Sequence, residues 1–126
     1  MSNNEARIRV NVKSEFVPEQ SDPGTERYVF AYHIAITNEG EEPARLLTRH
    51  WVITDGEAKV EEVRGDGVVG QQPSIAPGET YEYSSGAILK TPVGSMQGSY
   101  GMIDEHGERF EAPIPVFRLA VPRMVH

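Results

Sequence analysis

Residues 27–38 read RYVFAYHIAITN, and this segment carries the clearest structural signal in the chain. Large apolar side chains stand at every second position, which is the period of a β-strand and places them all on one face. Aromatic and β-branched residues also fit a pleated, half-buried surface. We therefore expect a central strand that packs against the core through Tyr28, Phe30, Tyr32, Ile34 and Ile36.

The same alternation continues on both sides of this strand. Upstream, residues 7–16 alternate between apolar and charged or polar side chains. Downstream, further strand-like segments cover residues 45–54, 58–63, 81–85, 96–103 and 110–121. Neither an amphipathic helix nor an internal repeat interrupts them. Seven or eight short strands of this kind are usually buried in two packed sheets, so we predict an all-β, immunoglobulin/fibronectin-III-like β-sandwich.

The phase of the alternation predicts details around the third strand. Asp55-Gly56 is typical of a tight hairpin turn, because this pair accepts positive φ angles. A change of phase between Val60 and Val63 indicates a bulge in the returning strand. Strict alternation before the turn places Leu46 and Val52 on one face, and on the other Leu47, Trp51 and Ile53.

The last strand carries two prolines, Pro113 and Pro115, and its alternation changes phase after Val116. Proline has no N–H to donate to a β-ladder. We therefore expect this strand to lie at a sheet edge or to be bulged.

Length and composition bound the function. With 126 residues the chain fits one domain, which we place at residues 7–122 between terminal segments 1–6 and 123–126. No cysteine is present, which excludes disulfides and thiolate metal sites. The formal charge of −7 disfavours nucleic acid and anionic membranes as partners. No signal peptide or long apolar run is found, so we expect a cytoplasmic protein.

Residues 65–70 read GDGVVG and match the dinucleotide-binding pattern G-x-G-x-x-G. In that fold the glycines open a helix whose N-terminus holds the pyrophosphate. Pro73 and Pro77 follow here and leave no room for a helix. We therefore reject the dinucleotide fold and expect an irregular loop. A weaker alternative is a nest of loop amides that binds an anion, which Arg64 favours and Asp66 opposes.

No catalytic or cofactor signature is found. Glu61 and Glu62 are adjacent and face opposite ways on a strand, so they cannot act as an acid/base pair. A turn containing Asp104 and Glu105 offers oxygen ligands for a loosely bound hard cation, although a solvated turn explains it better. The histidines have no metal-site spacing; they are His33, His50, His106 and His126.

Arg49 is the most informative charged residue. It shares a face with Trp51, where its guanidinium would stack on an aromatic ring or pair with a buried acid. A structural ion pair and a binding role explain it equally well. Arg45, Arg49 and Arg64 would form a local basic rim if the fold brought them together.

Several segments together resemble the bacterial ApaG family. They are LLTRHW (46–51), VRGDGVVGQQP (63–73), IAPG (75–78), SG (85–86), TP (91–92), MQGSY (96–100) and IPVF (114–117), and the resemblance extends from about residue 7 to 122. It implies a fibronectin-III-like or immunoglobulin-like sandwich and no established catalytic activity. Similar domains form the C-terminal module of an F-box protein and of a polymerase-interacting protein, which implies a platform for protein binding. The family also carries a cobalt and magnesium efflux label, and the bacterial gene often neighbours a diadenosine tetraphosphate hydrolase.

These observations favour a non-catalytic module that binds a protein partner and needs no cofactor. A sensor for nucleotide polyphosphate or pyrophosphate, or one linked to divalent-cation homeostasis, is the alternative. An exposed edge strand at residues 7–16 would also permit a homodimer. The candidate binding residues are Arg49, His50, Trp51 and Arg64, with Gly65, Gly67, Gly70 and Pro73 shaping the loop.

Overall fold

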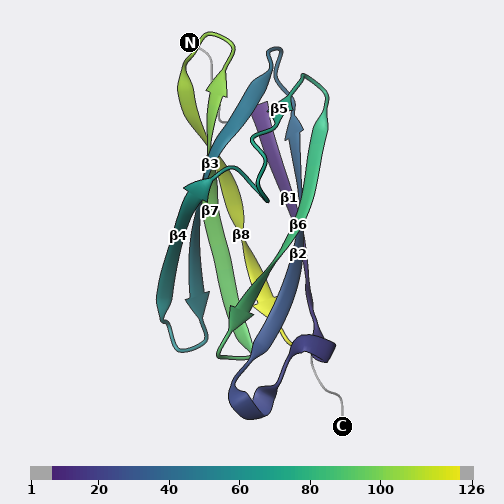
Figure 1. The fold of residues 1–126 in the computed structure, drawn as a ribbon, viewed down its shortest axis with the longest axis vertical. Coiled ribbons are helices and arrows are strands. Elements are labelled where there is room, and N and C mark those ends of the chain that lie inside the picture. Colours follow the sequence, from purple (N-terminus) through teal and green to yellow (C-terminus); the bar gives the residue numbers. More distant parts are fainter. Residues whose placement is uncertain (1–6, 123–126) are drawn as a thin grey trace.

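The computed structural model describes residues 7–122 and shows two antiparallel sheets packed face to face (Figure 1). This confirms the predicted all-β sandwich, which contains eight strands. The expected terminal segments, 1–6 and 123–126, lie outside the described residues.

The smaller sheet has the strand order β1-β2-β6, formed by Ile8–Phe16, Tyr28–Asn38 and Thr80–Leu89. Two 3-10 turns, η2 (Pro18–Gln20) and η3 (Pro23–Thr25), connect its first two strands. As predicted, β2 is central, and its even-numbered side chains from Phe30 to Ile36 are buried.

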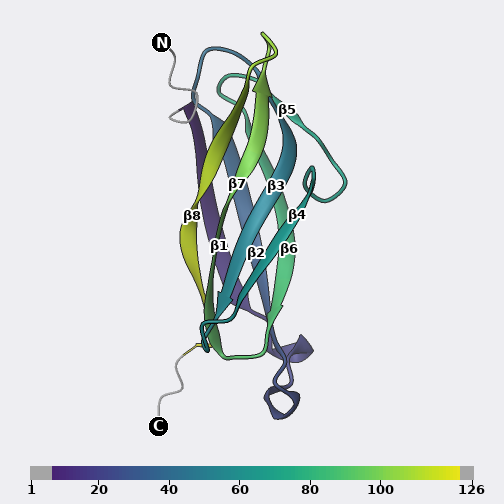
Figure 2. The ribbon, with the colours of Figure 1, turned by 90° about the vertical axis from the view of Figure 1, so that its left-hand side faces the viewer.

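The larger sheet has the order β4-β3-β7-β8, with the short β5 paired to β3 (Figure 2). Its strands are β3 (Ala44–Asp55), β4 (Val60–Asp66), β5 (Ser74–Ile75), β7 (Val93–Asp104) and β8 (Arg109–Ala120). The inner faces of the two sheets form one hydrophobic core.

Because of a β-bulge in β3, the faces predicted for the side chains at the start of this strand are wrong. The register between β3 and β7 shifts between Leu46 and Thr48, so the extra residue Leu47 reverses the alternation. Leu46 is therefore fully buried and Leu47 is partly exposed, contrary to the sequence-based expectation. The bulge predicted for the returning strand is absent, because β4 pairs with β3 in regular register from Val60 to Asp66.

The hairpin between β3 and β4 exists as predicted, but its turn is wider than a two-residue turn. Residues 56–59 form the connection, and the carboxylate of Asp55 accepts hydrogen bonds from the N–H groups of Glu57 and Lys59. Ala58, with φ of 65°, takes the left-handed conformation that we expected of Gly56. A capped loop thus replaces the tight Asp-Gly turn.

The expectation for the last strand is confirmed. β8 lies at an edge of its sheet, and its register with β7 shifts between Met96 and Gly98. Val116 lies in the irregular segment and is 64% exposed.

The two open sides of the sandwich differ. On one side β1 contacts β8, and the hydroxyl of Ser14 donates a hydrogen bond to the carbonyl of Arg118. On the other side the edges of β4 and β6 do not pair with each other within the described chain. The less protected edges are therefore those of β4 and β6, rather than the edge at residues 7–16 that the sequence indicated. A homodimer through β1 stays a prediction.

Candidate functional site

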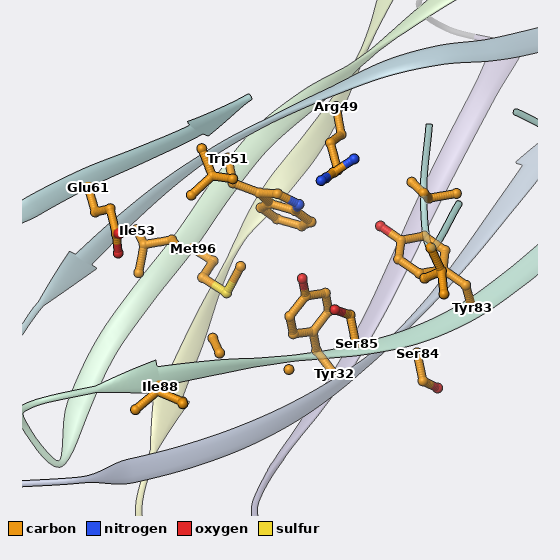
Figure 3. Close-up of a pocket in the computed structure, with 15 residues that line it drawn as sticks. Tyr32, Arg49, Trp51, Ile53, Glu61, Tyr83, Ser84, Ser85, Ile88 and Met96 are labelled. Carbon is orange, nitrogen blue, oxygen red and sulfur yellow. The ribbon is translucent and has the colours of Figure 1, made fainter. Parts of the chain in front are cut away.

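A groove runs between β4 and β6 on the open side of the sandwich, and we call it the β4–β6 groove. It contains a cavity of about 380 Å³ whose lining includes Tyr32, Trp51, Tyr83, Ile88 and Met96 (Figure 3). A second cavity of about 200 Å³ shares Ile88 with the first and continues toward Val60 and Lys90. The groove is thus elongated along the strands.

Aromatic packing fixes the floor of the groove. Trp51 is 3% exposed, and its ring meets those of Tyr32, Tyr100 and Phe117 edge-on or tilted, with centroids 5.5, 6.5 and 5.9 Å away. Edge-to-face contacts of this kind stabilise aromatic pairs beyond the area that they bury. The floor is therefore a rigid, mainly apolar surface.

Arg49 supplies the positive charge of the groove. It lies on the groove side of β3, as does Trp51, which confirms their predicted common face (Figure 3). Its Nη1 donates hydrogen bonds to the carbonyls of Asp66 and Gly67, at 2.8 and 2.9 Å. Among residues 7–122 no carboxylate pairs with it. The guanidinium is thus oriented by backbone carbonyls while its charge stays unneutralised.

Burial keeps the tyrosine hydroxyls of the floor neutral. It raises the pKa of Tyr32 above its ordinary value and raises the pKa values of Tyr83 and Tyr100 further. The hydroxyls of Tyr83 and Tyr100 are hydrogen-bonded to each other at 2.5 Å. These groups therefore act as neutral hydrogen-bonding partners.

The glycine-rich loop of residues 67–73 ends in β5, not in a helix, which confirms the exclusion of a dinucleotide fold. Gly67 has φ of 64°, and a Cβ there would collide with the carbonyl of Gln71. The N–H groups of Gly67, Val68 and Gln71 donate to carbonyls of the chain itself. Fewer loop amides are therefore available to an anion than the sequence indicated, and this alternative stays a prediction.

The predicted binding residues are divided between two cavities that share Arg49. Trp51 lines the groove, whereas a separate cavity of about 390 Å³ includes His50, Arg64 and Gly65 in its lining. There the imidazole Nε2 of His50 lies 2.8 Å from a carboxylate oxygen of Glu62, and Nη2 of Arg64 lies 3.6 Å from the same oxygen.

The remaining predicted positions shape the loop. Gly70 is exposed and has φ of 76°, and the carbonyl of Pro73 accepts a hydrogen bond from Leu46. Of the expected basic rim, Arg49 and Arg64 line one cavity, whereas Arg45 is not part of that lining and donates to the carbonyl of Gln72.

The acidic turn before β8 gains a third potential ligand from the fold. Ligand atoms of Glu42, Glu105 and His106 all lie within 4.8 Å of one another. The imidazole Nε2 of His106 is 3.3 Å from the carboxylate Oε1 of Glu42. The N–H groups of Glu108 and His106 lower the pKa of Asp104 and occupy its carboxylate as a turn cap. Loose cation binding here stays a prediction. The fourth histidine, His126, lies outside the described residues.

Comparison with known proteins gives the family. The sequence model described as "ApaG domain" matches residues 18–104. The chain belongs to the ApaG family. It is 63% identical to Protein ApaG of Aromatoleum aromaticum over 95% of this chain and 94% of that protein. It is 55% identical to Protein ApaG of Bordetella pertussis over the whole of both chains. These names state no activity.

Solved structures agree with the ApaG assignment. A crystal structure of an ApaA protein from Bordetella pertussis has a TM-score of 0.90 at 57% identity, covering 93% of this chain and 95% of that one. The C-terminal domain of Wzt shares the fold alone, with a TM-score of 0.56 at 8% identity over 94% of this chain and 75% of that domain. Within the described residues, no helix is long and apolar enough to cross a membrane.

Sequence reasoning missed the part that β6 plays in this ApaG site. Residues 83–88 line the cavity opposite Arg49 and Trp51. The available signal was the segment 83–89, YSSGAIL, which carries no charge and no proline. Edge strands normally carry charged residues or proline, which protect them against pairing with other chains.

Proposed function

We propose that this ApaG protein is a protein-binding module that holds an extended segment of its partner in the β4–β6 groove. The main support is that the groove lies between two sheet edges, those of β4 and β6, which do not pair with each other. An extended chain that enters such a groove gains backbone hydrogen bonds from an edge and apolar contacts from the floor.

Exposed apolar side chains line the same groove. Val69 is 64% exposed and Ile88 is 55% exposed, and both line the main cavity. Val60, 62% exposed, lines the second cavity beside Ile88. Exposed apolar residues that gather along one feature are typical of interaction sites.

The charges of the groove favour a peptide over a nucleotide polyphosphate. Arg49 is the only cationic residue among those that line the main cavity, and Glu61 lies in the same lining. A polyphosphate carries several negative charges and is normally bound by several cations or backbone amides. One arginine facing an apolar floor instead fits a segment with one carboxylate and several apolar side chains.

Selection from a random library of extended peptides tests the proposal. The selected peptides should bind the natural protein and lose at least tenfold in affinity to Val69→Asp, because the new carboxylate lies in the groove. Asp also tolerates the φ of 48° found at this position. Val116→Asp is the matched control, since Val116 is equally exposed but lies in β8, away from the groove. Failure to select any peptide, or equal loss in both variants, would contradict the proposal.

A further inference from the structure

The register of the smaller sheet shows which backbone groups of β6 are unpaired. The N–H of Asn38 bonds the carbonyl of Glu79, and the N–H of Gly78 bonds the carbonyl of Asn38. In an antiparallel ladder such pairs recur at every second residue. Odd-numbered residues of β6 therefore bond to β2, and the N–H and C=O groups that point outward belong to Glu82, Ser84, Gly86 and Ile88.

The edge of β6 is better suited than the edge of β4 to pair with an added strand. Between Tyr83 and Leu89 it has no charged residue, and Ser84, Gly86 and Ile88 all line the main cavity. The facing edge of β4 carries Glu62 and Arg64 at its outward-bonding positions. Charged side chains on an edge oppose strand addition, so an added strand pairs with β6.

The groove is closed at one end and open at the other. After β4 the chain turns across toward the smaller sheet (Figure 1). Val68 and Val69 of this loop line the main cavity together with Tyr83, and Arg49 donates to the last carbonyl of β4 and the first carbonyl of the loop. In the opposite direction the groove continues past Ile88 into the second cavity. The unneutralised charge of Arg49 thus stands at the closed end.

We propose that the groove captures the C-terminus of a partner protein, which adds to β6 as an antiparallel strand and places its terminal carboxylate against Arg49. This inference rests on the proposed function and specifies the bound segment. β6 runs from Tyr83 at the closed end to Leu89 at the open end, so an antiparallel strand that enters at the open end terminates at Arg49.

The remaining donors of Arg49 suit this role. Its Nη1 is engaged by the carbonyls of Asp66 and Gly67, while within the described chain no acceptor occupies Nε or Nη2. A carboxylate accepts two hydrogen bonds from an arginine in one plane. Side chains at alternate positions of the bound strand would face Ile53 and Val63, which line the main cavity and are partly exposed.

Two matched pools of nonapeptides test the capture of a chain end. Each pool is rich in valine, isoleucine and threonine over its last four positions; one ends in a free carboxylate and the other in an amide. The free acid should bind about tenfold or more tightly, the size expected for a charge-assisted hydrogen bond. Arg49→Gln should remove this difference and Arg49→Lys should keep part of it, with thermal melting checking that both variants fold.

Hydrogen exchange identifies the strand that is extended. Binding of the free-acid pool should slow exchange at the amides of Ser84, Gly86 and Ile88 and leave Glu82, beyond the closed end, unchanged. Slowing at Glu62 and Arg64 instead would overturn the assignment to β6, and equal affinity of acid and amide would overturn capture of the carboxylate. In either case bound peptide would leave the proposed function standing, whereas binding of neither pool, with no peptide selected from the random library, would contradict the function itself.

Discussion

Gly65 lies directly opposite Arg49 in the β3–β4 ladder, and its missing side chain leaves the space that the guanidinium occupies. A Cβ on residue 65 would stand 2.7 Å from the guanidinium carbon. The glycine therefore sets the position of the one cation in the main cavity. A glycine-rich motif of this form usually indicates phosphate binding, and the role of Gly65 here is different.

Gly65→Ala should displace the Arg49 guanidinium and weaken binding of the free-acid peptides about tenfold. The cost in unfolding free energy should stay near 1 kcal/mol, because the far end of a flexible side chain gives way. Gly70→Ala is the control. It has open space around it but φ of 76°, so strain costs about 1 kcal/mol while affinity stays unchanged. Titration and urea unfolding measure the two quantities, and equal affinities for both variants would refute this role of Gly65.

The bulge in β3 makes opposite predictions for two neighbouring leucines. Leu46→Ala should lower the unfolding free energy by about 3 kcal/mol, because Leu46 is fully buried and leaves a cavity. Leu47→Ala should cost less than about 1 kcal/mol, since the bulge turns Leu47 away from the core. Urea unfolding compares them directly. A larger loss for Leu47→Ala would place the bulge elsewhere.

Asn38 is the buried polar anchor between the two sheets. Its Nδ2 donates to the carbonyls of Glu42 and Ile75, and its Oδ1 accepts from the N–H of Gly40. Asn38→Ala would leave buried backbone groups unpaired and should cost about 3 kcal/mol of unfolding free energy. Asn11→Ala, at an exposed position of β1, is the control and should change stability by less than about 0.5 kcal/mol.

Stability should fall in alkali because of the tyrosines of the floor. Burial raises the pKa values of Tyr83 and Tyr100 above the ordinary value of 10.0. Above pH 10 the unfolded chain loses these protons while the folded chain keeps them, so unfolding becomes easier. Each tyrosine contributes a slope of about 1.4 kcal/mol per pH unit above pH 10.

The double variant Tyr83→Phe/Tyr100→Phe should flatten this dependence. Removing both hydroxyls together also avoids leaving one of them buried without a partner. Tyr28→Phe, at a half-buried position outside this pair, controls for the loss of a tyrosine. Urea unfolding at several pH values between 8 and 11 measures the slopes, and an unchanged slope in the double variant would contradict this explanation.

Local sequence was sufficient for much of the architecture. Alternation with period two identified the strands, because apolar side chains must face one side of a half-buried strand. Pro73 and Pro77 were sufficient to exclude a helix after the glycine motif, since proline lacks an N–H and clashes with the preceding turn. The prolines of β8 likewise indicated an irregular edge strand, which the structure confirms.

The candidate site was harder to predict from the sequence, because it depends on how the strands are paired and ordered. The position of the β3 bulge follows from the register with β7, and it decides that Leu46 rather than Leu47 is buried. Arg49 and Arg64 are both candidate binding cations in the sequence, yet only Arg49 lines the main cavity of the groove, and the pairing of β3 with β4 decides this.

What the amino-acid sequence determined by itself was the set of extended segments, the bend after Gly70 and the family. Only the tertiary structure decided which edges stay open, and that β6 and Arg49 share one groove. The physical reason is that strand formation follows from neighbouring residues, whereas sheet order and register follow from contacts between residues far apart in the chain. The groove is a product of those distant contacts.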